Sequence, residues 1–435
     1  MRRVTVVGAG LAGSEAAWQL ANRGIPVRLV EMRPVLMTPA HTTDRFGELV
    51  CSNSLGADVV TSPAGILKAE LRKLQSLVMK AADRYPVPAG RALAVDRERF
   101  AEAVTETLTA HPLVETIREE AVEIPDSPCI VATGPLTSQN MAKCISGLTG
   151  QEFLYFHDAV APVIERDSID MGRAYRGSRY GQGEDYINCP LDETAYDLLV
   201  QGLLSAERAQ KHEFEGRHPY FEGCLPVEVI ASRGRDTLRF GPLRPVGLPD
   251  PATGREPFAV VQLRQDNLEG TLYNMVGFQT SLKWGGQERV FRLIPALAQA
   301  EFARLGVMHR NLYVNAPSVL DKGLGVAGRK GLFLAGQIVG VEGYMESTAM
   351  GIVAALSMAS FLKGGDFPVW PRETAIGSLL HYLSDARPEK FQPMNVNLGI
   401  FPPLEKRSRS RTDRCEAVAA RAASAFDSFL ASLPA

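Results

Sequence analysis

The sequence predicts an α/β protein in which a Rossmann-like nucleotide-binding domain is discontinuous and a smaller α+β domain is inserted into it. The first residues have the pattern of a strand, a glycine turn, a helix and a second strand. A buried strand, another glycine turn and an alanine-rich helix return late in the chain, so the middle is interpreted as the insertion. The 435 residues suffice for two or three compact units. We expect a nucleotide-binding domain at 1–185 and 310–435 and an insertion at 186–309.

The opening stretch RRVTVVGAGLAGSEAAWQLANRGIPVRLVEMR predicts a dinucleotide site. A strand is followed by Gly8, Gly10 and Gly13, an alanine-rich helix, and a second strand that ends at Glu31. The first glycine permits a tight turn, the second lets the backbone approach a pyrophosphate, and the third lets the helix pack on the strand. Glu31 lies where a ribose hydroxyl would find its acceptor. The candidate cofactor residues here are Gly8, Ala9, Gly10, Leu11, Ala12, Gly13, Glu31 and Arg33.

Three features favour FAD over NAD or S-adenosylmethionine in this site. The glycine motif begins essentially at the N-terminus, as in flavoproteins. The stretch CIVATGP, with Gly134, is similar to the strand and turn that flavin oxidoreductases place beneath the cofactor. Later, GLFLAGQIVGVEGYMESTAMGIVAAL predicts a buried strand, a turn at Gly336 and Gln337, and a helix from about Met345. The N–H groups that begin such a helix can face the flavin or its phosphates.

The six cysteines are widely spread, without a CxxC pair or a His/Cys cluster at metal-ligand spacing. This pattern predicts reduced thiols, a cytoplasmic protein and no metal site. Cys51 stands where the apolar run of FGELVCSNSLG gives way to small polar residues, and Cys224 lies in the similar stretch FEGCLPVEV. From the residues alone, packing in a core is the commoner role of a free cysteine.

Composition excludes several classes of partner. Forty-five per cent hydrophobic and 22% charged residues are typical of a globular protein. No apolar run approaches the roughly 18 residues that cross a bilayer, so we expect no membrane partner. The net charge of −2 gives no overall attraction for nucleic acid, which leaves local patches. Two basic stretches, 233–244 and 404–414, could hold a polyanion, although solvated surface explains them equally well from charge alone.

Ten segments together resemble one family closely, and the resemblance covers nearly the whole chain. The family is that of the folate- and FAD-dependent tRNA (uracil-5-)-methyltransferases. The segments are EMRP (31–34), TPAH (38–41), FGELVCSNSLG (46–56), VPAGRALAVDR (87–97), FEGCLPVEV (221–229), FGPLRPVGL (240–248), VVQLRQDN (260–267), GFQTSLKW (277–284), VMHRN (307–311) and GQIVGVEGYMES (336–347).

The resemblance implies that the protein forms 5-methyluridine in the T-loop of tRNA. The carbon donor would be 5,10-methylenetetrahydrofolate, the hydride donor reduced FAD, and the reductant of the flavin NADPH or NADH. The chemistry is coherent, because carbon 5 of uracil is a weak nucleophile until a thiolate adds at carbon 6. A one-carbon unit at the methylene level then needs two more electrons to become a methyl group.

The resemblance also implies roles for individual residues. Cys51 and Cys224 would be the catalytic pair, with Cys224 the favoured nucleophile, Cys51 its partner beside the flavin, and the reverse order open. His309 and Trp284 are candidates for contact with folate. Tyr344, next to the expected flavin ring, is either a stacking aromatic or a core tyrosine.

The expected phosphate contacts position tRNA without reading its sequence, and the target uridine would be flipped out of its loop. They are Arg233, Arg235, Lys406, Arg407, Arg409 and Arg411.

Two other functions fit parts of the sequence. FAD-dependent modifiers of the tRNA wobble uridine share the glycine-rich flavin turn, but they need a long C-terminal helical domain, and this chain ends about thirty residues after Lys406. A flavin-binding scaffold without turnover would not need two cysteines in motif context. The oligomeric state is left open by the sequence.

Overall fold

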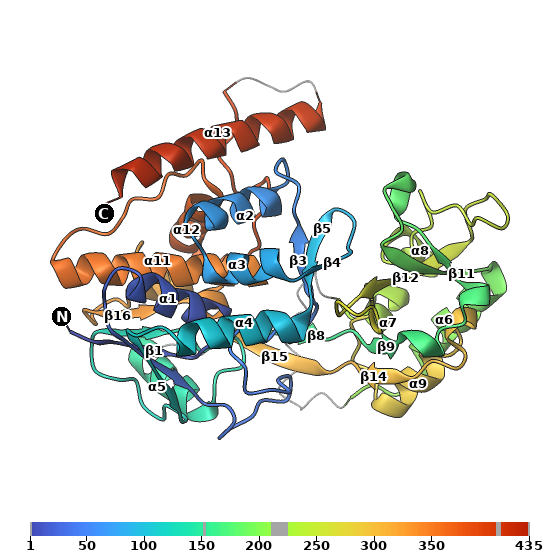
Figure 1. The fold of residues 1–435 in the computed structure, drawn as a ribbon, viewed down its shortest axis with the longest axis horizontal. Coiled ribbons are helices and arrows are strands. Elements are labelled where there is room, and N and C mark those ends of the chain that lie inside the picture. The colour runs from blue at the N-terminus through green and yellow to red at the C-terminus, as the bar shows by residue number, and fades with distance from the viewer. Residues whose placement is uncertain (1, 151–153, 210–224, 406–409, 434–435) are drawn as a thin grey trace.

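The structure, a computed structural model, describes residues 2–150, 154–209, 225–405 and 410–433. Figure 1 shows two units side by side. The larger unit contains both ends of the chain, and the smaller unit is formed by its middle. This arrangement confirms the predicted fold class, a nucleotide-binding domain with a smaller inserted domain.

A five-stranded parallel sheet forms the base of the larger unit, with the order β16-β7-β1-β2-β6. The strands in the middle and at the β16 side of this sheet, VTVV, CIV and LFL, are almost entirely buried and apolar, as is typical of parallel strands covered on both faces. The last strand returns from far along the chain, so the sheet is discontinuous in sequence. The strands are β1 (Val4–Val7), β2 (Val27–Glu31), β6 (Val114–Arg118), β7 (Cys129–Val131) and β16 (Leu332–Leu334).

Two helices pack tightly beside this sheet. In α11 (Tyr344–Lys363), a Cβ at Gly351 would lie 2.3 Å from the backbone oxygen of Ala12 in α1 (Leu11–Ala21), so glycine permits the close approach. By length and composition α11 could span a membrane, but 78% of its apolar window is buried, as in a core helix. The other described helices of this unit are α2 (Pro63–Lys73), α3 (Leu77–Arg84), α4 (Arg97–Thr109), α5 (Gln139–Thr149), α10 (Ala316–Val319), α12 (Ala375–Asp385) and α13 (Arg411–Ser432).

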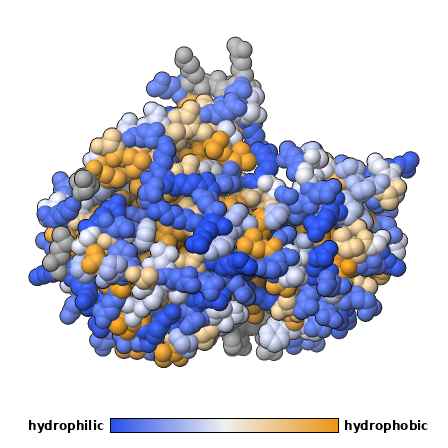
Figure 2. Space-filling model, in the orientation of Figure 1, coloured by the Kyte–Doolittle hydropathy of each residue, from blue (hydrophilic) through white to orange (hydrophobic). Residues whose placement is uncertain are grey.

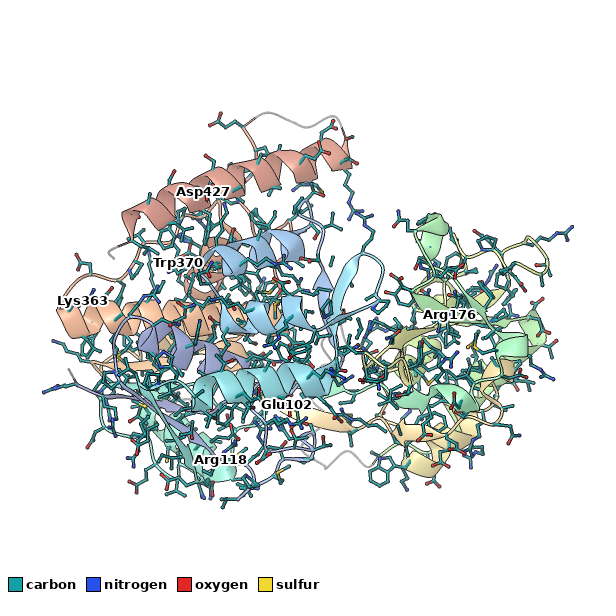
Figure 3. The ribbon with its side chains drawn as sticks, in the orientation of Figure 1. Glu102, Arg118, Arg176, Lys363, Trp370 and Asp427 are labelled. Carbon is teal, nitrogen blue, oxygen red and sulfur yellow. The ribbon has the colours of Figure 1, made fainter. Side chains whose placement is uncertain are left out.

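Helix α13 covers the outer side of α2 and α12 (Figure 1). The ring of Trp370 lies 4.4 Å from that of Phe429 in α13, and Asp427 on the same helix pairs with Lys73 of α2 (Figure 3). Figure 2 shows hydrophobic residues gathered in this region, where a groove of about 690 Å³ runs between α2 and α13.

The smaller unit contains a six-stranded antiparallel sheet with the order β10-β11-β12-β13-β9-β14. One face of this sheet is apolar and contributes Ile187, Cys189, Val261 and Leu263 to a second core. The strands are β9 (Val163–Glu165), β10 (Tyr175–Arg176), β11 (Tyr186–Leu191), β12 (Ala259–Gln265), β13 (Leu272–Met275) and β14 (Phe302–Arg304), and the described helices are α6 (Glu193–Ser205), α7 (Val227–Ser232), α8 (Thr237–Phe240) and α9 (Trp284–Phe291).

A two-stranded antiparallel ribbon, β8 (Leu154–Ala159) with β15 (Met308–Tyr313), joins the two units. The strands β9 and β10 pair within the smaller sheet although both precede residue 186, the predicted boundary. Glycines and charges break the sequence pattern at 175–186, whereas long-range pairing decides which sheet these short strands join. We therefore propose that the inserted unit extends from β9 to β14.

The segment that carries Cys51 leads into a third, small antiparallel sheet with the order β3-β5-β4. Its strands are β3 (Ser54–Ala57), β4 (Pro86–Val87) and β5 (Ala92–Val95). The segment 46–53, here called the Cys51 loop, thus lies between the nucleotide-binding sheet and the smaller unit.

Candidate active site

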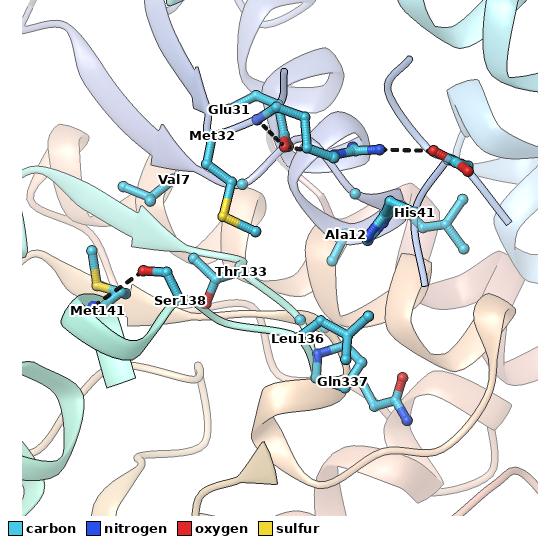
Figure 4. Close-up of a pocket in the computed structure, with 18 of the residues that line it drawn as sticks. Val7, Ala12, Glu31, Met32, His41, Thr133, Leu136, Ser138, Met141 and Gln337 are labelled. Carbon is cyan, nitrogen blue, oxygen red and sulfur yellow. Dashed lines mark hydrogen bonds and ion pairs between the residues drawn. The ribbon is translucent and has the colours of Figure 1, made fainter. Parts of the chain in front are cut away.

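A cavity of about 960 Å³ opens at the carboxyl ends of β1, β2 and β7 (Figure 4). In open α/β sheets this edge is where nucleotides bind. Figure 4 shows Glu31 and Gln337 at opposite ends of the cavity, with Thr133 between them. The predicted cofactor residues that line it are Gly8, Gly10, Leu11, Ala12, Glu31, Arg33, Gly134, Gly336, Gln337 and Tyr344.

The three glycines of the first turn differ in what surrounds them. A Cβ at Gly8, whose φ is +95°, would lie 2.6 Å from the backbone oxygen of Ala132. A Cβ at Gly13 would lie 1.7 Å from the oxygen of Gly8, so this glycine serves the packing of α1 and does not line the cavity. Around Gly10, by contrast, a Cβ would meet nothing within 4 Å. Gly10 therefore leaves open the space that a pyrophosphate needs.

Glu31 is held in place by its neighbours. Its carboxylate accepts hydrogen bonds from the N–H of Ala9 at 2.8 Å, and from the N–H and Nε of Arg33 at 3.1 and 2.8 Å. Burial opposes ionisation, but the charge of Arg33 and these hydrogen bonds hold the pKa of Glu31 below its ordinary value. A carboxylate has about four acceptor positions, so one is left for a ribose hydroxyl. Ala9 contributes through this backbone contact and not through its side chain.

Arg33 connects the cavity to the loop beside it. Besides Glu31, its guanidinium donates to the carboxylate of Glu48 at 3.0 Å and to the backbone oxygen of Thr43 at 3.1 Å. The side chain is almost fully buried. Arg33 therefore fixes the wall of the cavity, a structural role that its position in the motif did not predict.

A second glycine turn forms the opposite wall. Gly336 has a φ of +83°, and a Cβ there would lie 2.7 Å from the Cβ of Ala12, so the turn packs directly on α1. Gln337 lines the cavity and donates to the carboxylate of Glu342. Gly134, on the turn after β7, has a φ of +67° and open space around it. Both turns expose backbone to the cavity, as a bound flavin requires.

Tyr344, the first residue of α11, joins the cavity to the Cys51 loop. Its side chain lines the cavity, and its hydroxyl accepts hydrogen bonds from the N–H of Cys51 at 2.8 Å and of Ser52 at 3.2 Å. The thiol of Cys51 is half-buried and lies 3.5 Å from the backbone oxygen of Ala159, at the end of β8. The side chain of Tyr344 thus lies between Cys51 and the predicted flavin site.

Two buried or partly buried arginines hold the carbonyl groups of the same loop. Arg97, at the start of α4, donates to the oxygens of Leu49 and Cys51 at 2.9 and 3.3 Å. Arg304 of β14 donates to the oxygen of Val50 at 2.7 Å. Burial lowers the pKa of Arg304. Burial also disfavours the charge of Arg97, but its ion pair with Asp266 raises the pKa above the ordinary value.

Arg264 of β12 approaches the loop from the smaller sheet. Its guanidinium donates to the Oδ1 of Asn53 at 2.9 Å and to the hydroxyl of Ser52 at 2.7 Å. The amide of Asn53 in turn donates to the oxygens of Val95 and Gln265, at 3.0 and 2.9 Å. Burial lowers the pKa of Arg264. The sequence analysis missed these contacts, although Ser52, Asn53 and the stretch VVQLRQDN were part of the family resemblance.

Several predicted residues lie outside this arrangement. Cys224, Lys406, Arg407 and Arg409 fall outside the described residues, as does the side chain of His309. Their roles stay predictions.

The remaining predicted contacts lie on the surface. Trp284 is 64% exposed at the start of α9 and does not line the cavity. Arg235 pairs with Asp197 and Glu193, at 2.7 and 2.8 Å, so its charge is largely matched. Arg233 and Arg411 are exposed. In the described part of the chain, no three His, Cys, Asp or Glu residues form a group that could hold a metal ion.

The open space at Gly10 yields a first test. We expect Gly10→Leu to lose FAD, because the side chain would occupy the place of the pyrophosphate while the backbone φ of −68° suits any residue. The measurement is flavin absorbance of the purified protein at equal protein concentration. Gly285→Leu, where a Cβ also meets nothing within 4 Å but in the smaller unit, is the control. Full flavin occupancy in Gly10→Leu would refute this assignment of the cavity.

Comparison with known proteins identifies the family of this chain. A family model described as glucose inhibited division protein A (GIDA) matches residues 3–366. A protein of Moorella thermoacetica named methylenetetrahydrofolate--tRNA-(uracil-5-)-methyltransferase TrmFO is 58% identical over 428 residues, 98% of each chain. The protein of that name from Anoxybacillus flavithermus is 56% identical over 431 residues, covering 99% of this chain and 100% of its own.

Among solved structures, GidA of Aquifex aeolicus superposes with a TM-score of 0.68, at 17% identity, over 98% of this chain and 73% of its own. At that identity the likeness concerns the fold. The two proteins that are 58% and 56% identical have the same name, which states their function, and they confirm the family resemblance found in the motifs. The chain belongs to the GIDA family and, within it, to the methylenetetrahydrofolate-dependent tRNA (uracil-5-)-methyltransferases named TrmFO.

Proposed function

We propose that this protein methylates carbon 5 of a uridine in the T-loop of tRNA, with 5,10-methylenetetrahydrofolate as the carbon donor. One observation carries the proposal: Tyr344 lines the nucleotide cavity and binds the backbone of Cys51 through its hydroxyl. The side chain of Tyr344 therefore contacts both the loop that carries the Cys51 thiol and the predicted flavin site. The names of the close relatives favour this function over wobble-uridine modification and over a scaffold without turnover.

The cavity fits FAD on observations of this chain. The space at Gly10 accommodates a pyrophosphate, Glu31 keeps an acceptor for a ribose hydroxyl, and two glycine turns present backbone to the ring. FAD, once reduced by NADPH or NADH, supplies the hydride that turns a methylene carbon into a methyl group. The residues of the chain bind it, position it beside Cys51 and keep the site closed by the Cys51 loop.

A thiolate of this chain performs the activation of the base. Its addition to carbon 6 of uracil makes carbon 5 nucleophilic, and carbon 5 then bonds to the one-carbon unit of the folate. Carbon 5 then loses its proton as the bond between the methylene carbon and the folate nitrogen breaks, which releases tetrahydrofolate. The methylene carbon gains a hydride, and the thiolate leaves carbon 6. We assign the addition to Cys224 and the position beside the cofactor to Cys51. The guanidinium groups of Arg97 and Arg264 at the Cys51 loop bring positive charge to the place where negative charge develops on the base as carbon 6 is attacked.

We propose a cytoplasmic site of action, because tRNA and reduced thiols occur together there. Phosphate contacts from Arg233, Arg411 and the basic residues near 406–409 stay part of the proposal.

The proposed reaction is tested by the origin of the methyl carbon. Unmodified tRNA is incubated with the protein, NADPH and methylenetetrahydrofolate labelled in its methylene carbon, and the nucleosides are analysed. We expect label in 5-methyluridine, and none when labelled S-adenosylmethionine replaces the folate. Transfer from S-adenosylmethionine alone would overturn the proposal.

The two cysteines should fail in different ways. We expect Cys51→Ala and Cys224→Ala to abolish methylation and retain FAD, because other residues, above all Gly10, form the proposed phosphate site. With tRNA that carries 5-fluorouridine, addition at carbon 6 leaves a stable adduct, since fluorine does not leave as a proton does. Cys224→Ala should form no adduct on a denaturing gel, whereas Cys51→Ala should still form one.

The reverse pattern would exchange the two assignments. Methylation at the wild-type rate by both variants would remove the cysteines from the mechanism.

The hydroxyl of Tyr344 should matter for rate and not for cofactor content. Tyr344→Phe leaves the N–H groups of Cys51 and Ser52 without their acceptor, so the Cys51 loop shifts. We expect methylation to fall by roughly 10- to 100-fold, because displacements of about 1 Å in an active site have such effects. FAD content and flavin reduction by NADPH should stay near wild type. Tyr382→Phe, which loses a hydrogen bond to Gln392 outside the cavity, is the control and should methylate normally.

A further inference from the structure

The sheet of the smaller unit has a polar face that begins at the Cys51 loop. On β12, Gln262 and Arg264 alternate with the core residues Val261 and Leu263. Arg264 reaches the hydroxyl of Ser52. Because side chains two positions apart lie on one face about 7 Å from each other, Gln262 is the next step away from the loop.

The polar face continues from Gln262 to a cation. Arg179 donates to the Oε1 of Gln262 at 3.0 Å, and also to the backbone oxygens of Val246 and Arg244 at 2.7 and 2.8 Å. All three acceptors are uncharged. Within the described part of the chain, no carboxylate forms an ion pair with Arg179 or with the exposed guanidinium of Arg244. Two arginines without matching acids therefore lie next to each other, and this proximity together with burial lowers the pKa of Arg179.

The nearby carboxylates of Glu256 and Asp250 accept hydrogen bonds from backbone N–H groups. Glu256 accepts the N–H of Gly247 at 2.7 Å, and Asp250 accepts the N–H of Ala252 at 2.8 Å. These contacts direct both carboxylates into their own turns. The positive charge of Arg244 stays available to a ligand.

Two large exposed aromatic residues are close to these arginines in the sequence: Tyr180 follows Arg179, and Phe240 is four residues before Arg244. Phe240, at the end of α8, is 77% exposed, and Tyr180 is 67% exposed. Tyr180 has a φ of +60°, a left-handed backbone conformation that is unfavourable for a non-glycine residue and persists only where neighbours enforce it. Here its N–H donates to the oxygen of Gly247 at 2.8 Å, and its ring packs on that glycine. The backbone thus keeps the ring of Tyr180 exposed on the surface, although its conformation is unfavourable.

We call the set of Arg179, Tyr180, Phe240 and Arg244 the aromatic–arginine patch. It belongs to the smaller unit, in which Figure 1 marks α8, the helix that ends at Phe240. Figure 3 labels Arg176, on the adjacent strand β10, whose guanidinium donates to the hydroxyl of Tyr273 and so supports this edge of the sheet.

We propose that the aromatic–arginine patch binds the part of the RNA substrate next to the target uridine. Unpaired bases would stack on Phe240 and Tyr180, and phosphates would contact Arg244, with Arg179 adding charge. Aromatic faces accept any base and arginines accept any phosphate, so the patch would position RNA without reading it. Exposed aromatic rings complement unpaired bases, and the positive charge of Arg244, which no described carboxylate matches, complements phosphates, so this chemistry favours RNA over a protein partner. This inference rests on the proposed function.

The test compares three variants with two controls. Tyr180→Ala, Phe240→Ala and Arg244→Glu alter the patch. Val369→Ala and Arg329→Glu alter an equally exposed hydrophobic residue and an exposed arginine of the larger unit. The ligand is a fluorescent RNA hairpin with the sequence of a tRNA T-arm, and binding is followed by anisotropy at several salt concentrations. Methylation of full-length tRNA gives kcat and KM, and reduction of the bound flavin by NADPH reports on the intact cofactor site.

We expect each alanine variant of the patch to weaken RNA binding by about 5- to 150-fold, the range found for loss of one stacked base. Arg244→Glu should lower the slope of log K against log salt by roughly 0.7 or more, since at least one phosphate contact is lost. KM for tRNA should rise while flavin reduction stays unchanged. The two controls should bind as wild type does.

The outcomes separate this inference from the function on which it rests. A wild-type protein that neither binds the hairpin nor methylates tRNA overturns the proposed function. A wild-type protein that methylates, with patch variants of unchanged affinity and salt slope, overturns the patch alone. An equal loss in the controls also overturns it, because the effect would then be unspecific.

Discussion

The active site depends on the hydrogen bonds that hold the Cys51 loop between the two units. A loop buried at such a place must find a partner for each backbone group, because water does not reach them. Tyr344 from the larger unit accepts its N–H groups, while Arg97 and Arg304 hold its carbonyl groups. Arg304 and Arg264 belong to the smaller sheet. Residues of both units therefore hold the backbone around Cys51, which makes the insertion part of the candidate active site.

This loop also collects buried positive charge. Arg97, Arg264 and Arg304 all contact the loop. Of these three, Arg97 forms an ion pair with a described carboxylate, that of Asp266. Burying unmatched guanidinium groups costs stability, and burial lowers the pKa of two of the three. The same imbalance stabilises negative charge nearby, whether on a thiolate or on an oxygen of the base as carbon 6 is attacked. The buried positive charge that lowers the stability of the fold is thus the same charge that the proposed chemistry requires.

Sequence patterns predicted the parts of the site that a few neighbouring residues determine. Gly8, Gly10 and Glu31 line the cavity as expected, because a turn and its flanking strands set their positions. The hydroxyl contact of Tyr344 with Cys51 could not, since it joins residues 293 positions apart. The boundary at 186 failed to anticipate the pairing of β9 for the same reason, because short strands join whichever sheet the fold brings to them. Arg33 lines the cavity as expected. Its bond to Glu48, which fixes the wall of the cavity, could not be predicted because Glu48 comes from another loop.

Alternation along β12 then explains how one strand can serve both structure and substrate. Its inward residues Val261 and Leu263 are fully buried in the core of the smaller unit, so the strand is rigid. The residues of its other face, Gln262 and Arg264, are also largely buried, and they bond to Arg179 on one side and to Ser52 on the other. Groups mounted on a rigid strand keep their spacing better than groups on loops. The distance between the Cys51 loop and the aromatic–arginine patch is therefore set by the pleat of a single strand, and a flexible substrate must adapt to the protein.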